Sequence, residues 1–208
     1  MPTEFAQHLA NIALKEFDDF GGIPETDSRM RKRVNQTYLP ALRQADPNDV
    51  LGWNMPEDIS TWPWSAVFVS WCLLHAGVRN AEFDFSIRHA MFIKRTIGNA
   101  LAGTGVFRGR KIGDYKPKIG DLICANAGTG QIAYNQAANQ NGYSSHSAIV
   151  VDVRPGVAFT VGGNEGNTVD KRRHVLSPTG FVVQRSPEAY ICVIENRKRT
   201  VSRRARER

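Results

Sequence analysis

Three polar residues stand where a nucleophilic hydrolase would need them: Ser65, His146 and Asn164. Ser65 precedes the apolar stretch 66–74, which predicts a buried helix with the serine at its start. A nucleophile there gains from the helix dipole and from free backbone N–H groups, which favour a developing anion. A histidine on a neighbouring strand can take the proton of the nucleophile, and an amide can orient the imidazole ring. The sequence therefore predicts Ser65 as nucleophile, His146 as general base and acid, and Asn164 as the orienting residue.

The motifs around these residues resemble those of the NlpC-type and CHAP cell-wall peptidases, relatives of the papain fold. The stretch "TWPWSAVFVSWCLLHAG" (61–77) is similar to the family's D-C-S-G-F-V-like motif, which opens a buried helix ending in A-G. Phe68-Val69 and Ala76-Gly77 fall at the family's offsets, so Ser65 takes the place of the catalytic cysteine. The Trp-Ser-Ala and Phe-Val-Ser-Trp pattern also suggests an uncharacterised bacterial branch in which this serine is native.

Three later segments extend the resemblance over roughly residues 60–195. "KPKIGDLICA" is similar to the family's P-G-D-L-V-F-F strand, and "SSHSAIVVDV" to its H-V-G-I-Y-L-G strand, which gives the histidine role to His146. "TVGGNEGN" resembles the strand with the third residue, where CHAP domains use Glu and Asn two apart. Gly162 stands in the Glu-like position, so only Asn164 fits. The resemblance implies a papain-like fold and hydrolysis of an amide bond in peptidoglycan stem peptides.

Each of these residues also has a simpler interpretation. Ser65 could be a helix N-cap, an active nucleophile, or the product of a Cys→Ser change that removed activity. His146 could be a structural histidine, and Asn164, among glycines, could only form a turn. Trp64 could line the cleft or belong to the core, and His89 is a candidate substrate contact near it.

The order of the elements predicts an α+β fold in which N-terminal helices pack on a small, mostly antiparallel sheet or half-barrel. Apolar periodicity predicts helices over 4–18, 27–44, 64–76 and 86–97, and a loop over 45–62. β-branched runs predict strands in "GDLICA", "HSAIVVDV", "VAFTV", "GFVVQR" and "AYICVIE", with "RPG" (154–156) as a hairpin turn. We expect an N-terminal helical extension (1–60) packed on the core, a papain-like hydrolase core (61–195) and a flexible basic tail (196–208).

Most of the positive charge lies in that tail. The chain of 208 residues has a net charge of +7, and residues 196–208 hold seven Arg or Lys and one Glu, or +6. Such a run is typical of a solvated end, and polyanion binding by the tail is the alternative. The body has no basic stripe interleaved with aromatic residues, which argues against a nucleic-acid-binding domain.

The composition indicates neither a metal nor another cofactor. The three cysteines are far apart, and no His, Asp or Glu group has zinc-like spacing. No apolar run is long enough for a membrane span, and the N-terminus lacks the pattern of a signal peptide. We therefore expect a protein made in the cytoplasm, with delivery to the cell envelope by another route left open.

Three classes of function remain open. The first is a peptidoglycan-peptide amidase or endopeptidase with a Ser-His-Asn site. The second is a catalytically silent module of the same fold that binds cell wall or peptide, in a phage particle or an effector system. The third is a protein that binds nucleic acid or the cell envelope through its basic tail. Oligomeric state and the bond cleaved do not follow from the sequence.

Overall fold

The computed structural model describes residues 1–45, 58 and 62–200 of the chain. Its elements in chain order are α1 (Glu4–Phe20), α2 (Ser28–Arg33), the π-helix η1 (Val34–Tyr38), α3 (Leu39–Ala45), α5 (Ser65–His75), α6 (His89–Ala102), β1 (Phe107–Arg110), β2 (Leu122–Asn126), α7 (Tyr134–Ala137), β3 (Ser145–Arg154), β4 (Val157–Gly162), β5 (Asp170–Val175) and β6 (Tyr190–Asn196). Most of the predicted loop 45–62 lies outside the described residues.

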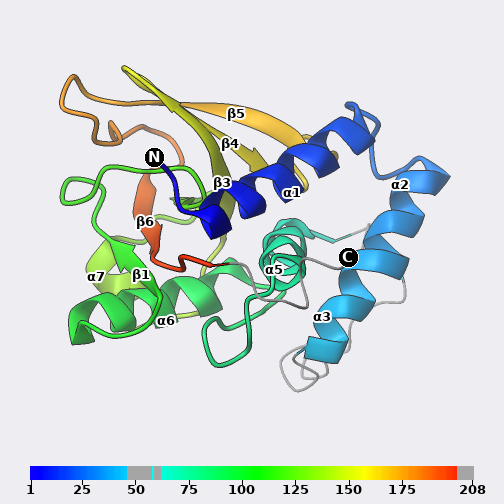
Figure 1. The fold of residues 1–208 in the computed structure, drawn as a ribbon, viewed down its shortest axis with the longest axis horizontal. Coiled ribbons are helices and arrows are strands. Elements are labelled where there is room, and N and C mark those ends of the chain that lie inside the picture. The colour runs from blue at the N-terminus through cyan, green and yellow to red at the C-terminus, as the bar shows by residue number, and fades with distance from the viewer. Residues whose placement is uncertain (46–57, 59–61, 201–208) are drawn as a thin grey trace.

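The first helix forms where the apolar stripe predicts it. Thr3 caps α1 by accepting a hydrogen bond from the Ala6 N–H at 3.1 Å, and the helix ends at Gly21 in the left-handed region. Phe5, Leu9 and other apolar residues of one face are fully buried. This face packs on β3, β4 and α5, so α1 lies along the sheet with α5 beside it (Figure 1).

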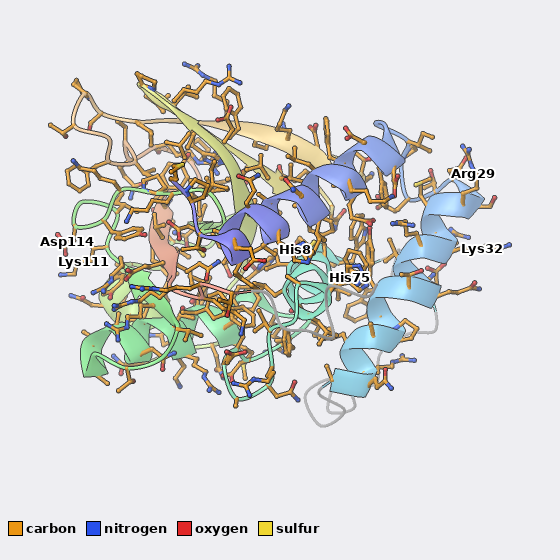
Figure 2. All side chains as sticks on the ribbon, in the orientation of Figure 1. His8, Arg29, Lys32, His75, Lys111 and Asp114 are labelled. Atoms are coloured by element: carbon orange, nitrogen blue, oxygen red, sulfur yellow. The ribbon has the colours of Figure 1, made fainter. Side chains whose placement is uncertain are left out.

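The single helix predicted over 27–44 is three consecutive helical segments, α2, η1 and α3. In the π-turn, the Leu39 N–H donates to the Val34 carbonyl five residues back. Pro40 follows this turn and has no N–H to donate to the preceding carbonyls, which favours a local departure from α-helical bonding. Arg29 and Lys32 project outward from α2 at the margin of the molecule (Figure 2).

The helix α5 is buried on every side, as its apolar composition predicts. Its first nine residues, Ser65 to Leu73, are all buried, and the chain leaves the helix at Ala76 and Gly77. α3, α1 and strand β3 pack around it, and Figure 1 shows α5 near the centre of the fold. This placement fixes the start of α5 against the sheet.

Six antiparallel strands form one open sheet in the order β1-β6-β2-β3-β4-β5. With helices preceding it, this sheet confirms the α+β class. Arg154 ends β3 and Val157 begins β4, so Pro155 and Gly156 form the predicted hairpin turn.

Two strands were not predicted from the sequence, and one predicted strand is wrong. β5 is a charged edge strand, "DKRRHV", in which only His174 is buried, and β1 has just four residues. Neither has the β-branched run that marks an interior strand. "GFVVQR" makes only an isolated bridge between Val182 and Leu176 and leaves Val183 exposed.

Both ends of the described chain pack on the body of the fold. Residues of α1 to α3 belong to the same hydrophobic core as α5, α6 and the sheet. At the other end, the Lys198 ammonium bonds both carboxylate oxygens of Glu82 at 2.7 and 2.9 Å. The Lys198 carbonyl accepts from the Thr3 hydroxyl at 2.9 Å. The tail thus begins packed on the body, and residues 201–208 lie outside the described residues.

Candidate active site

Ser65 is the first residue of α5, and its hydroxyl is hydrogen-bonded to a histidine. The Ser65 Oγ lies 2.7 Å from Nε2 of His89, which is the first residue of α6. Both side chains are buried, at 6% and 5% exposure. The N-cap position belongs to Trp64, which makes no side-chain capping bond, so the interpretation of Ser65 as an N-cap is wrong. Its partner is also His89 and not His146.

The start of α5 supplies backbone donors next to the serine. The first helical hydrogen bond joins the Phe68 N–H to the Trp64 carbonyl at 3.0 Å. Helix geometry therefore leaves the N–H groups of Ser65, Ala66 and Val67 without a partner inside the helix. These donors, together with the positive end of the helix dipole, can stabilise an anion that forms beside the serine oxygen.

A pair of reciprocal hydrogen bonds holds His89 at this distance. The Ser70 hydroxyl, one turn further along α5, donates to the Ser86 carbonyl at 2.9 Å and accepts from the Ser86 N–H at 3.1 Å. Ser70 and Ser86 are fully buried, which makes this connection between α5 and the segment before α6 rigid. His89 begins α6 three residues after that connection.

His146 forms a second pair, with an acidic residue that the sequence did not single out. Its Nε2 lies 2.9 Å from Oε1 of Glu165, and the other carboxylate oxygen of Glu165 accepts from Nε of Arg172 at 2.7 Å. Asn164 was predicted for this orienting position, but it is a turn residue with φ of 56°. Glu165 is the residue after Asn164 in "GGNEGN". The sequence feature that could have identified it is a carboxylate followed closely by the basic segment "DKRRHV", which forms β5.

The two histidines are neighbours in space. Their ring centroids are 5.4 Å apart at an angle of 56°. Burial, followed by the charge of His146, holds the pKa of His89 well below its ordinary value, so His89 is neutral near pH 7. Burial would raise the pKa of Glu165, but the hydrogen bonds with His146 and Arg172 outweigh it and leave that pKa lowered. The site therefore combines a neutral histidine at the serine with a carboxylate-bound histidine beside it.

Gly162 keeps room for the pair formed by His146 and Glu165. A Cβ at this position would lie 2.8 Å from Glu165 Oε1 and 3.0 Å from His146 Nε2. Such contacts are closer than side-chain carbons normally approach. By the sequence resemblance, position 162 corresponds to a Glu in CHAP domains. In this protein the carboxylate comes instead from Glu165 in the following turn, and the glycine leaves room for it.

A cavity of about 560 Å³ opens in front of Ser65 and His89. Trp62, Pro63 and Ile87 give it apolar wall area, and Trp62 is half exposed. Trp64, expected as a substrate contact, is fully buried and packs on Phe20 at a ring distance of 5.9 Å. The remaining lining residues come mainly from the loop between β2 and β3: Ala127, Gly128, Asn141, Gly142, Tyr143, Ser144 and Ser145.

Several polar atoms of residues lining this cavity are buried without a hydrogen-bond partner. Within the described part of the chain these include His89 Nδ1, the Tyr143 hydroxyl and Ser145 Oγ. Buried polar groups are nearly always paired in proteins, so unpaired ones are unusual at a structural position.

His146 and Glu165 line a second cavity, of about 420 Å³. Two arginines, Arg172 and Arg185, also line it, together with His174 and Glu188. His174 is bonded at both ring nitrogens, to Thr160 and Tyr190, each at 2.8 Å. Ala127 borders both cavities, and the neighbouring rings of His89 and His146 line one cavity each.

The three cysteines take no part in either cavity. Cys72, Cys124 and Cys192 are all free and fully buried. In the described ranges, no three His, Cys, Asp or Glu side chains are grouped so that they could hold a metal ion. Over the same residues, no helix has the length and apolar character needed to cross a membrane.

The chain matches no curated protein and no solved structure. One family does match it, over residues 37–203, and that span contains Ser65, His89, His146 and Glu165. Since it covers well over half of the chain, the protein belongs to this family, described as "uncharacterized protein conserved in bacteria (DUF2272)".

Proposed function

We propose that the protein is a hydrolase that cleaves an amide bond through an acyl-serine intermediate, with Ser65 as nucleophile and His89 as its base. The observation that carries this proposal is the distance of 2.7 Å between Ser65 Oγ and His89 Nε2. A nucleophile and a base within hydrogen-bond reach are the minimal requirement for covalent catalysis by serine. The neutral state of His89 leaves it able to accept the proton.

The reaction follows in two steps. Ser65 Oγ attacks the carbonyl carbon as His89 Nε2 takes the hydroxyl proton, and the backbone N–H groups at the start of α5 receive the oxyanion. The C–N bond breaks, the amine leaves with the proton from His89, and Ser65 holds the acyl group as an ester. A water molecule then attacks that ester, giving its proton to His89 and releasing the acid as Ser65 regains a proton.

His146 and Glu165 act as a second proton-transfer unit in this scheme. Glu165 orients the His146 ring through Nε2, as a carboxylate does in serine hydrolases. His146 lies beside His89, with ring centroids 5.4 Å apart, and lines the second cavity, where the amine released with the proton from His89 takes up a further proton to become an ammonium ion. The role of general base passes from His146 to His89, and the orienting role from Asn164 to Glu165.

The substrate proposed from the sequence motifs is a peptide, in particular a stem peptide of peptidoglycan. The resemblance to NlpC-type and CHAP peptidases supports this class. The cavity of about 560 Å³ beside Ser65, with Trp62 on its wall, is within the range of about 300–1,000 Å³ that is usual for small-ligand sites.

A serine-directed fluorophosphonate probe tests the nucleophile directly. We expect mass spectrometry to locate the label on Ser65, and the label to disappear in Ser65→Ala and fall strongly in His89→Gln. Ser177→Ala serves as control, because Ser177 is in a turn that lines neither cavity. Wild type and Ser65→Cys are then incubated with purified peptidoglycan and with peptide amides, and the products are identified by mass. Absence of both label and hydrolysis would instead favour the silent binding module.

A further inference from the structure

We propose that the second cavity binds a carboxylate of the substrate, so that the amide cleaved is the one next to a free carboxyl group. The inference rests on the proposed function, because it assigns the leaving-group side of the same site. It makes the expected substrate a peptide cleaved at its C-terminal amide bond.

Both arginines of the second cavity have N–H donors that are not used within the described protein. Among the described residues, Arg172 makes hydrogen bonds only through Nε, to Glu165. Arg185 donates from Nε and Nη2 to the carbonyl and carboxylate of Glu188, at 3.0 and 3.3 Å. The outer nitrogens of Arg172 and the Nη1 of Arg185 therefore remain for a ligand, and guanidinium groups suit carboxylates in geometry and charge.

The acidic residues of this cavity, Glu165 and Glu188, already have partners. Glu165 is occupied on one oxygen by His146 and on the other by Arg172. Glu188 is 48% exposed in its pair with Arg185, and exposed pairs of this kind hold their partners weakly. A ligand carboxylate can therefore replace Glu188 at Arg185.

Arg185 is also held in place for this task. Its guanidinium lies over the Tyr190 ring at 4.8 Å from the ring centre. Tyr190 is fixed in turn by its hydrogen bond to His174. A cation positioned by ring stacking loses less freedom when it binds an anion than a free arginine would.

The second cavity is a neighbour of the nucleophile. His146 lines it and lies 5.4 Å by ring centroids from His89, whose Nε2 is 2.7 Å from Ser65 Oγ. Ala127 lines both cavities. For a substrate with its carbonyl at Ser65 and its acyl part against Trp62, the arginine-lined cavity is therefore the adjoining place for a carboxylate on the leaving-group side.

Binding to the inactive variant Ser65→Ala provides the test, because it does not depend on turnover. The probes are benzoyl-alanyl-alanine, in its L,L and D,D forms, and the corresponding C-terminal carboxamides, measured by calorimetry. We expect at least one acid to bind about tenfold or more tightly than its carboxamide. Adding Arg185→Gln should reduce the affinity for the acid to that for the amide, and Arg185→Lys should retain part of it. Arg173→Gln is the control, since Arg173 is exposed on β5 outside the cavity.

Three results would overturn the inference: equal affinity for acid and amide, an equal loss for both with Arg185→Gln, or no binding of any probe. Labelling of wild-type Ser65 by the fluorophosphonate separates this from the proposed function, because the label carries no carboxylate. A labelled serine without carboxylate preference contradicts only the inference. Carboxylate binding without labelling or hydrolysis contradicts only the proposed function.

Discussion

Ser65 Oγ and His89 Nε2 lie 2.7 Å apart although 24 residues separate them in the chain. Each residue opens a helix, and the bonds between Ser70 and Ser86 hold the two helix starts together. The contact is thus built into the buried framework of the protein. A hydroxyl and an imidazole fixed in this way need no rearrangement before proton transfer.

Replacing Ser65 by cysteine tests how complete the surrounding machinery is. Thiolate is a better nucleophile than a serine hydroxyl, while His89 and the backbone donors of α5 are unchanged. We expect Ser65→Cys to raise amidase activity on peptide substrates about tenfold or more over the serine enzyme, and His89→Ala to remove that activity. Rates from a coupled amine-release assay provide the measurement. A cysteine variant that alkylates readily with iodoacetamide but hydrolyses nothing would contradict the proposal.

Gly162→Ala should uncouple His146 from Glu165 without touching either residue. The new Cβ would lie within 3.0 Å of both interacting atoms, so one of them must move. Proton transfer by a positioned side chain contributes about 10²–10⁴-fold to rate, and we expect kcat to fall at least about tenfold. Gly98→Ala is the matched control, because a Cβ there meets nothing within 4 Å. Equal rates in the two variants would show that the His146 pair is not used.

His174 should make the fold sensitive to mild acid. Burial, then Arg185, lowers its pKa from 6.5 to about 4 in the folded protein. On acidification the unfolded chain takes up a proton before the folded one does, so stability is lost as the pH falls below about 6.5, and the loss ends near pH 4. Between pH 7.5 and pH 5, protonation of His174 in the unfolded chain should lower the free energy of unfolding by about 2 kcal/mol, at about 1.36 kcal/mol per pKa unit. Urea unfolding at both pH values should show that His174→Gln loses less free energy of unfolding on acidification than wild type does. Equal losses in the two proteins would show that His174 is not the group responsible.

The buried acid of α1 should be the most sensitive ionic position in the helices. Glu16 is 2% exposed and accepts hydrogen bonds from both Arg33 and the Tyr38 hydroxyl. Arg33→Ala removes both hydrogen bonds from the guanidinium to the buried carboxylate, and we expect a loss of about 2–3 kcal/mol in the free energy of unfolding. Lys15→Ala removes an exposed pair with Asp19 and should cost about 0.5 kcal/mol or less. Chemical unfolding of both variants checks the difference.

The basic end of the chain should separate into two functional parts. Deleting 201–208 should leave the melting temperature nearly unchanged and weaken salt-sensitive binding to a polyanion such as heparin. Deleting 197–208 also removes the ion pair of Lys198 with Glu82 and the bond from Thr3, and should lower the melting temperature by several degrees. Heparin affinity at two salt concentrations and a thermal melt give both readings. A large thermal effect of the shorter deletion would show that 201–208 also packs on the body.

The local elements were largely predictable, because apolar periodicity follows directly from burial. The helix at 65–75, the strands around Ile123, Val150 and Val193, and the turn at Pro155 could all be read from residue types. β5 could not be predicted in this way. It is an edge strand that is held by backbone pairing with β4, and its charged side chains face solvent, so it carries no apolar pattern. The segment "GFVVQR" has the composition of a strand but finds no neighbouring strand beyond one bridge.

The sequence by itself determined the α+β class, the buried helix and the presence of a serine at its start, because these depend on patterns within a few residues. The tertiary structure alone decided which histidine meets the serine. The rings of His89 and His146 are neighbours, 5.4 Å apart by centroids, but only His89 contacts Ser65. The bonds between Ser70 and Ser86, which hold the segment before α6 against α5, put His89 there. It also decided that Glu165 and not Asn164 bonds His146, because Gly162 leaves space for the carboxylate and Arg172 on the next strand holds it there. Side-chain pairings across elements depend on distances of a few tenths of an ångström, which no spacing along the chain encodes.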